Sequence, residues 1–341
     1  MNHFFTLPAP KSGLLAERLQ VLEAEVSARL EQEKQAGRTL QYTKVFLSDA
    51  ANQQKALLDS PLYRDHLSKA PCTFVGQVPL DGSKITLLLK TDERQEACLF
   101  HSLRLDEAEA AGKDSYAQTR LLFERYLDIL AEKGLRMDVH CVRTWIYVRD
   151  IDANYAGVVR ARNDVFDREG LTIDTHFIAS TGIGGRSEAR HALVGMDFLT
   201  YPDIEEQQKH YLKAPDFLGS PHDYGVAFER GTALKTADGT KLFISGTASI
   251  DKSGKILHEG QVLRQTGRLL ENIDALLHDG GASLENAGYF IIYLRDLSDY
   301  AAVAGYMRSR FPDKPLVILL AEVCRPGWLI EMECTAWVPA K

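Results

Sequence analysis

A five-residue phrase recurs three times in this chain and limits its fold more than any other feature. The phrase reads VFLSD at 45–49, IYVRD at 146–150 and IYLRD at 292–296. Each copy closes an apolar run of strand length, follows a long amphipathic helix and precedes a second helix. Recurrence at this scale indicates one supersecondary unit that cannot bury the face of its sheet alone. We therefore predict three copies of this unit, packed against one another within a single chain.

The predicted elements around the phrase follow the order α-β-α-β-β. Helices are expected over 13–36, 52–69, 115–134, 155–169, 260–281 and 300–311. Strands are expected over 40–49, 97–103, 138–150, 175–184, 189–201 and 287–299, and as strand pairs over 72–80 with 84–91, 225–235 with 240–251, and 316–338. The pattern predicts an α+β fold with modules at 1–95, 96–205 and 206–341, closed into an intrachain pseudo-trimer. The first module is expected to serve as a scaffold.

Composition limits the class of protein. The 341 residues are 45% hydrophobic and 26% charged, as in a soluble globular protein, and the net charge of −7 argues against a nucleic-acid partner. The five cysteines form no Cys/His cluster with zinc spacing, so no metal is expected. The N-terminus lacks the pattern of a signal peptide, and no apolar run approaches the ~20 residues of a membrane span. We expect a cytoplasmic protein with no membrane partner, and the mildly acidic charge does not exclude a small anionic substrate, since local arginines can override it.

Two glutamates in the last strand are the clearest candidates for chemistry. Glu331 and Glu333 are two residues apart in LIEMEC, so their side chains point to the same face of a strand. Burying a carboxylate without a partner is costly, although both could instead face solvent on the open side of an antiparallel sheet. The comparable strands of the other copies, KITLLLKT and ALVGMDFL, contain only Asp197. This asymmetry predicts one working site. Glu331, flanked by Ile330 and Met332, suits the role of a general acid, and Glu333 is expected as a structural or supporting partner.

Candidate substrate-binding residues are spread along the chain. Arginine binds carboxylates bidentately, although any one arginine could instead form a surface ion pair. Strand alternation places Arg143 and Trp145 on one face with Tyr147. The glycines of STGIGG could let backbone N–H groups approach a carboxylate, or could belong to a flexible hairpin. The further candidates are Arg295, Arg168, Arg325, Tyr224, Gly182, Gly184 and, beside the acids, Cys324.

Residues 224–338 resemble the RidA (YjgF/YER057c/UK114) family. The resemblance rests on KLFISGTASID, LLENIDALL, YFIIYLRDLSDY and LIEMECTAWV. It implies a chorismate-mutase-like α+β fold whose members form trimers with ligand sites between subunits. In this chain the three units would be fused.

A narrower resemblance, to the chorismatases, runs from Arg143 to the C-terminus through RTWIYV, FDREGL, STGIGG and KLFISGTASI. It implies conversion of chorismate to pyruvate and a hydroxybenzoate or dihydroxycyclohexadiene carboxylate, without a cofactor. Glu331 matches the family's acid, and Arg295 and Tyr224 match substrate-binding positions. The alternatives are an enamine/imine deaminase or hydrolase of the RidA type and a non-catalytic ligand-binding protein. Pro315 and Leu316 stand where RidA deaminases have an arginine, and ARNDVFDREG lacks the tyrosine and glycine that chorismatases tend to have there.

Overall fold

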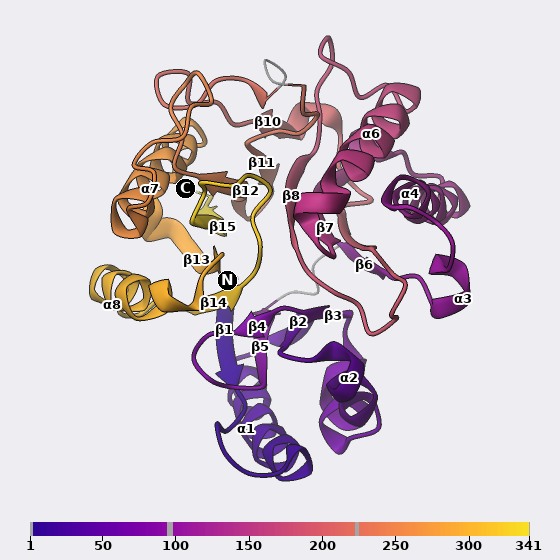
Figure 1. Ribbon diagram of the computed structural model, residues 1–341, viewed down its shortest axis with the longest axis vertical. Helices are drawn as coiled ribbons and strands as arrows, with labels where there is room; N and C mark the ends of the chain where they lie inside the picture. Colours follow the sequence, from indigo (N-terminus) through magenta and orange to yellow (C-terminus); the bar gives the residue numbers. More distant parts are fainter. Residues whose placement is uncertain (1–2, 94–97, 222–224, 341) are drawn as a thin grey trace.

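Three β-sheets lie toward the centre of the molecule, with helices on the outside (Figure 1). The computed structural model describes residues 3–93, 98–221 and 225–340. The first sheet has the strand order β1 (His3–Pro8), β5 (Ile85–Asp92), β2 (Thr39–Leu47) and β3 (Cys72–Gly76). The second has the order β6 (Leu99–Leu103), β9 (Val194–Thr200), β7 (Cys141–Val148) and β8 (Ala179–Gly184).

The third sheet is the largest and includes one strand from the N-terminal part of the chain. Its order is β10 (Lys209–Tyr211), β11 (Gly231–Thr236), β12 (Gly239–Ala248), β15 (Ile330–Pro339), β13 (Ala287–Leu294), β14 (Leu316–Leu320) and β4 (Val78–Pro79). Because β4 pairs with β14, the N-terminal segment is hydrogen-bonded to the C-terminal sheet. The module boundaries at 95/96 and 205/206 stay a prediction.

All three sheets share one pairing pattern. The strand that carries the recurring phrase (β2, β7 or β13) is parallel to one neighbour (β3, β8 or β14) and antiparallel to the other (β5, β9 or β15). Each of these three strands also has a register shift near its start, at Gln41, Val142 and Gly288. The repeat seen in the sequence therefore extends to the position of a β-bulge.

The central place of the phrase-bearing strand corrects two expectations. The strands within 316–338 do not pair with each other, since β13 lies between β14 and β15. In the same way β2 separates β3 from β5, so 72–80 and 84–91 do not form a hairpin. In each sheet the strand after the second helix (β3, β8 or β14) runs parallel to the phrase-bearing strand and lies beside it. The chain then crosses over, and the next strand pairs with the other edge of the phrase-bearing strand.

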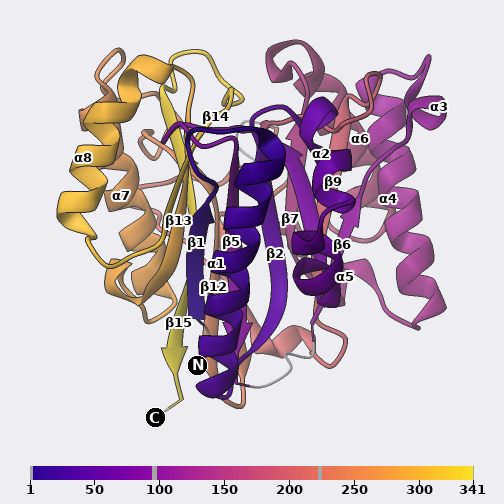
Figure 2. The ribbon, with the colours of Figure 1, turned by 90° about the horizontal axis from the view of Figure 1, so that it is seen from below.

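The helices cover the outer faces of the sheets (Figure 2). They are α1 (Leu15–Gln35), α2 (Ala50–Leu58), α3 (Glu107–Ala110), α4 (Ser115–Glu132), α5 (Met137–His140), α6 (Ile151–Arg168), α7 (Val262–Asp279) and α8 (Tyr300–Arg310). Helix α7 shows why they lie there: Leu269, Leu270, Ile273, Leu276 and Leu277 recur at helical spacing and are buried. No helix in the described part of the chain is both long and apolar enough to cross a membrane.

Two element boundaries differ from the sequence-based prediction, and one strand was not predicted. The helix expected over 52–69 is α2 followed by a π-helical turn, Leu62–His66, and a 3-10 turn, Leu67–Lys69. The strand expected from residue 138 begins at Cys141, after the short helix α5. Strand β1 was not predicted because HFFTLP is short and ends in proline, which is confined to the edges of strands.

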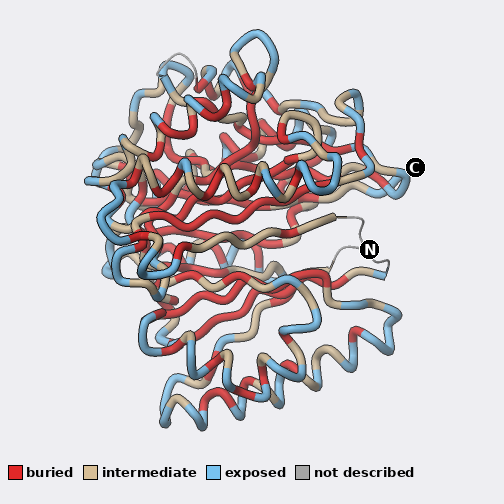
Figure 3. The backbone as a smooth tube through the Cα atoms, turned by 90° about the vertical axis from the view of Figure 1, so that its right-hand side faces the viewer, coloured by how far each residue is buried: buried red, intermediate tan, exposed pale blue. Residues whose placement is uncertain are grey.

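Charged side chains are buried between the sheets, whose strands form the buried interior of the molecule (Figure 3). Arg143 and Glu333 form an ion pair in which Nη2 lies 2.8 Å from Oε2, and both side chains are at most 2% exposed. Arg104 Nη1 lies 3.0 Å from Oδ1 of Asp197, and Oδ2 of the same residue accepts a hydrogen bond from the Tyr147 hydroxyl. Buried charges are tolerated when they are paired and hydrogen-bonded, as these are.

Candidate active site

A buried cavity of about 250 Å³ lies where the second sheet meets the third. Helix α6 and strand β8 form one side, and the other side consists of the end of β12, the start of β15 and the loop before β15. Its volume is just below the usual range of ~300–1,000 Å³ for small-molecule sites. The lining residues are Tyr155, Val159, Arg162, Ser180, Gly182, Gly225, Val226, Phe228, Arg230, Gly246, Ala248, Ile250, Cys324, Arg325, Trp328 and Glu331.

Glu331 is the acid in this cavity. Its side chain is 4% exposed, and its carboxyl has no hydrogen-bond partner among the residues that the structure describes. Burial raises the pKa of Glu331 to about 8, and the negative charge of Glu333 adds to the increase. A carboxyl that stays protonated at neutral pH can donate a proton to a bound molecule. Glu331 therefore has the protonation state that a general acid needs.

Two glycines make room for the side chains of the cavity. A Cβ on Gly246 would overlap Oε1 of Glu331, and a Cβ on Gly182 would lie 2.9 Å from the ring of Tyr155. Gly246 belongs to a register shift between Ile244 and Thr247, which takes this part of β12 out of regular pairing with β15. The bulge and the missing side chain together leave space for the Glu331 carboxyl.

Arg162, on helix α6, lines the same cavity as this acid. Arg162 is 1% exposed, and its Nε and Nη2 atoms have no hydrogen-bond partner among the described residues. Burial lowers the pKa of Arg162. A buried guanidinium with unsatisfied donors is costly, and a carboxylate ligand would satisfy two of them at once. Arg162 thus indicates an anionic ligand in the cavity.

Glu333 lies behind Glu331 and is fully engaged by protein groups. It accepts hydrogen bonds from Arg143 Nη2 at 2.8 Å, from Trp145 Nε1 at 2.7 Å and from the Thr181 hydroxyl. The same Thr181 hydroxyl accepts a hydrogen bond from the backbone N–H of Gly246. These hydrogen bonds hold the Glu333 carboxylate in place as the negative charge next to the acid, Glu331.

The structure does not place Arg143 and Trp145, which were expected to bind substrate, in this cavity. Neither residue lines the cavity, because alternation along β7 turns both side chains toward the interior, where each bonds to Glu333. Both residues share a face of β7 with Tyr147, as expected. The Tyr147 hydroxyl, however, donates its hydrogen bond to Asp197 and not to Glu333.

Four further candidates are placed as follows. Arg295 donates to the Val323 carbonyl at 2.5 Å and pairs with Asp152, outside the cavity. Arg168 is at the surface, paired with Glu124 and Glu169. Gly184 donates its N–H to the Glu322 carbonyl and lines a different cavity. These three therefore do not lie with Glu331. Tyr224 lies outside the described residues.

Gly182, Cys324 and Arg325 do line the cavity with Glu331. Burial, followed by the charge of Glu331, raises the pKa of the Cys324 thiol to about 12. Their functional roles stay predictions. The sequence reading missed Tyr155, Arg162, Phe228, Arg230 and Trp328. A signal for Arg162 was available, since it follows Val158 by four residues on the apolar face of a helix, where a lone arginine is unusual.

The equivalent positions of the other sheets carry no acid. Glu331 pairs with Tyr293 in β13, and the matching register positions are Gly195 opposite Tyr147 and Thr86 opposite Phe46. The side chain of Arg104 packs against Gly195, where a Cβ would lie 2.8 Å from its Cδ atom. Residues 3–93, 98–221 and 225–340 contain no group of three or more His, Cys, Asp or Glu side chains that could hold a metal ion.

The fold and the inter-sheet cavity define an α+β protein whose sheets meet around a buried carboxyl. The model of the endoribonuclease L-PSP family matches residues 232–338. A RutC family protein of Pyrococcus abyssi is 34% identical over 101 residues, which cover 29% of this chain and 80% of that protein. A 3-hydroxybenzoate synthase of Streptomyces hygroscopicus is 29% identical over 244 residues, or 63% of this chain and 68% of that protein.

A chorismatase crystal structure has the same fold, with a TM-score of 0.68 and 22% identity over 87% of this chain and 93% of that chain. The chain belongs to the RidA (YjgF/YER057c/UK114) superfamily. Within it, the chain is close to the chorismatase-like members.

Proposed function

We propose that this protein is a chorismatase-type enzyme that cleaves chorismate, or a close cyclic enolpyruvyl dicarboxylate, to pyruvate and a cyclic product. The observation that carries the proposal is that one cavity contains the buried carboxyl of Glu331, whose pKa is raised, and the buried guanidinium of Arg162, whose Nε and Nη2 have no partner among the described residues. The likeness to a 3-hydroxybenzoate synthase over most of both chains supports the choice of substrate.

Glu331 would protonate the methylene carbon of the enolpyruvyl group. The enol ether then becomes an oxocarbenium-like centre, and the neighbouring carboxylate of Glu331 stabilises its positive charge. If water adds, the hemiketal collapses with cleavage of the C–O bond to the ring, giving pyruvate and a dihydroxycyclohexadiene carboxylate. If a ring hydroxyl attacks, it forms a cyclic ketal. Loss of a ring proton then makes the ring aromatic as the bond between that oxygen and the ring breaks, and the hemiketal that remains collapses to pyruvate and a hydroxybenzoate, with no net consumption of water.

The two carboxylates of chorismate would be held by Arg162 and Arg230. Both residues line the cavity and are nearly buried, at 1% and 7% exposure. Bidentate pairing would fix the substrate's orientation and bring the methylene carbon to Glu331. Arg325, next to Cys324 in the loop before β15, contributes further positive charge.

We also propose that the modules 1–95, 96–205 and 206–341 form an intrachain pseudo-trimer with one working site of three. The shared strand order, the shared bulge and the loss of the acid at Gly195 and Thr86 support this arrangement. The lining residues of the cavity then come from two of the three modules, 96–205 and 206–341.

The experiment that tests the substrate is incubation with chorismate. Loss of its ultraviolet absorbance together with release of one pyruvate per chorismate would support the proposal, and chromatography of the products would identify the cyclic one. A parallel incubation with a 2-imino acid, assayed for ammonia, tests deamination. Ammonia release without chorismate turnover would contradict the proposal, and so would the absence of both activities.

A further inference from the structure

We propose that the indole N–H of Trp328 selects the ligand of the Glu331 cavity by donating a hydrogen bond to an oxygen on the ligand's ring. Trp328 lines this cavity together with Glu331 and Arg162. The role deepens the proposed function and rests on it for one point, that the ligand is a cyclic carboxylate. It makes Trp328 a specificity-determining residue, because a ring without an oxygen at that point would leave the N–H group unpaired.

The indole N–H of Trp328 is buried without a partner. The residue is 8% exposed, and its Nε1 atom has no hydrogen-bond partner among the residues that the structure describes. A buried indole N–H usually has one, as in Trp145, whose Nε1 donates to Glu333 at 2.7 Å. Leaving such a donor unpaired in the interior is unfavourable, and an acceptor on a bound molecule would remove that cost.

The loop that carries Trp328 is held in place by Gln265 of helix α7. The Gln265 side chain donates from Nε2 to the Gly327 carbonyl at 2.9 Å and accepts from the Leu329 N–H at 2.9 Å. These bonds fix the backbone on both sides of Trp328, and Gln265 itself is fully buried. The backbone N–H of Trp328 also donates to the Arg325 carbonyl at 3.2 Å. Because the loop is already ordered, a ligand that bonds to the indole does not have to order it.

Arg162 and Trp328 offer two different kinds of donor to one ligand. The unpaired Nε and Nη2 atoms of Arg162 lie on one edge of its guanidinium, with the spacing of the two oxygens of a carboxylate. Trp328 offers a single uncharged N–H, which suits one hydroxyl or ether oxygen. The side chains of Val226, Ala248 and Ile250 make much of the remaining wall apolar. Together these groups fit a cyclic carboxylate with an oxygen on its ring better than an unsubstituted one.

Benzoate and the hydroxybenzoates are the probes, because they share a ring and a carboxylate and differ only in one hydroxyl group. We expect at least one hydroxybenzoate to bind the wild-type protein about tenfold more tightly than benzoate does, as measured by titration calorimetry. Trp328→Phe keeps an aromatic ring and lacks the N–H, so this preference should disappear. Arg162→Gln should weaken the binding of all these ligands and keep the preference.

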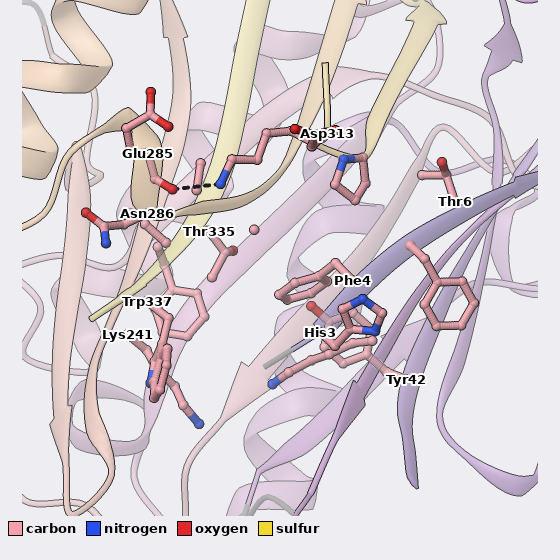
Figure 4. Close-up of a pocket in the computed structure, with 18 of the residues that line it drawn as sticks. His3, Phe4, Thr6, Tyr42, Lys241, Glu285, Asn286, Asp313, Thr335 and Trp337 are labelled. Carbon is pink, nitrogen blue, oxygen red and sulfur yellow. Dashed lines mark hydrogen bonds between the residues drawn. The ribbon is translucent and has the colours of Figure 1, made fainter. Parts of the chain in front are cut away.

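The indole N–H resonances of the wild-type protein give a second readout. The chain has three tryptophans, of which Trp145 already donates to Glu333 and Trp337 lines a separate cavity beside β1 (Figure 4). The Trp328 resonance should therefore shift when the preferred hydroxybenzoate binds, while the other two stay in place. Trp337→Phe assigns one resonance, and slow hydrogen exchange distinguishes the bonded Trp145 from Trp328. Trp337→Phe is also the matched control, and it should bind every probe as the wild type does.

The role of Trp328 is overturned if folded Trp328→Phe keeps the preference, or if the wild type binds benzoate and the hydroxybenzoates equally or not at all. It is also overturned if the Trp328 resonance stays unchanged while a hydroxybenzoate saturates the protein, a result that can be obtained even if Trp328→Phe fails to fold. Turnover of chorismate alongside any of these results would leave the proposed function standing. The expected preference and shift without turnover would support the role of Trp328 and contradict the proposed function.

Discussion

The Cα atom of Gly246 stands so close to the carboxyl of Glu331 that a Cβ there would overlap Oε1 and lie 2.9 Å from the carboxyl carbon. Gly246 is thus part of the space that the acid occupies. Replacing it by alanine must displace either the carboxyl or the bulged strand β12, because the nearest atoms on the other side belong to Thr181.

Gly246→Ala should therefore lose activity through misplacement of the acid. A displacement of about 1 Å near reacting groups can cost about 10²-fold in rate, and we expect a fall in kcat of that order. The measurement is the initial rate of pyruvate release from chorismate. Gly305→Ala is the matched control, since a Cβ at Gly305 meets nothing within 4 Å. Full activity in Gly246→Ala would contradict the placement of Glu331.

Arg162→Gln should weaken substrate binding more than it slows the chemical step. A hydrogen-bonded carboxylate–guanidinium contact contributes about 1.5–3 kcal/mol, so KM should rise roughly 10- to 100-fold. Steady-state kinetics with chorismate would measure the change. Arg168→Gln removes a surface arginine that pairs with Glu124, and its KM should equal that of the wild type. The assignment fails if the two variants behave alike.

The raised pKa of Glu331 predicts how stability changes with pH. Its pKa is about 8 in the folded protein and about 4.5 in the unfolded chain, so the folded state holds the proton more tightly. The contribution of Glu331 to the free energy of unfolding should therefore be most favourable to the folded state below pH 4.5. It should fall as the pH rises from about 4.5 to 8. Glu331→Gln lacks this loss, so it should gain stability relative to the wild type between pH 5 and pH 9.

Urea denaturation of both proteins at the two pH values checks this prediction. Other buried groups with shifted pKa values, such as Lys44 and Lys241, are present in both proteins, so their effects cancel in the difference. A difference in stability that is constant with pH would mean that Glu331 is not protonated in the folded state at neutral pH.

The buried pair of Arg143 and Glu333 should be costly to break. Removing one partner leaves an uncompensated charge in the interior, and we expect Arg143→Met to lower the free energy of unfolding by about 3–5 kcal/mol. Thermal or urea denaturation measures the loss. Breaking the exposed Arg168–Glu124 pair with Arg168→Gln should cost less than about 1 kcal/mol. Equal effects of the two substitutions would contradict a supporting role for the Arg143–Glu333 layer.

The sequence predicted the repeat well because the phrase at 45–49, 146–150 and 292–296 is local. Its apolar residues and the helices on either side are decided within about twenty residues of chain. It did not predict that β13 would separate β14 from β15, because strand order depends on how the helix between them crosses the sheet.

The candidate site was only partly predictable for a related reason. The spacing of Glu331 and Glu333 gave their common face, but alternation cannot tell whether that face meets a cavity or the interior. Arg143 was therefore assigned to the substrate, although it bonds to Glu333. Arg162 enters the site from helix α6, and its proximity to Glu331 arises only from contact between two sheets.

The most direct test of the account is the rate of pyruvate release from chorismate by the wild type, Glu331→Gln and Glu259→Gln. General acids typically contribute about 10²–10⁴-fold, so kcat should fall by that factor in Glu331→Gln, whereas the exposed Glu259 should be dispensable. Turnover of chorismate by Glu331→Gln at the wild-type rate would contradict the role of Glu331, and no turnover by the wild type would contradict the proposed function.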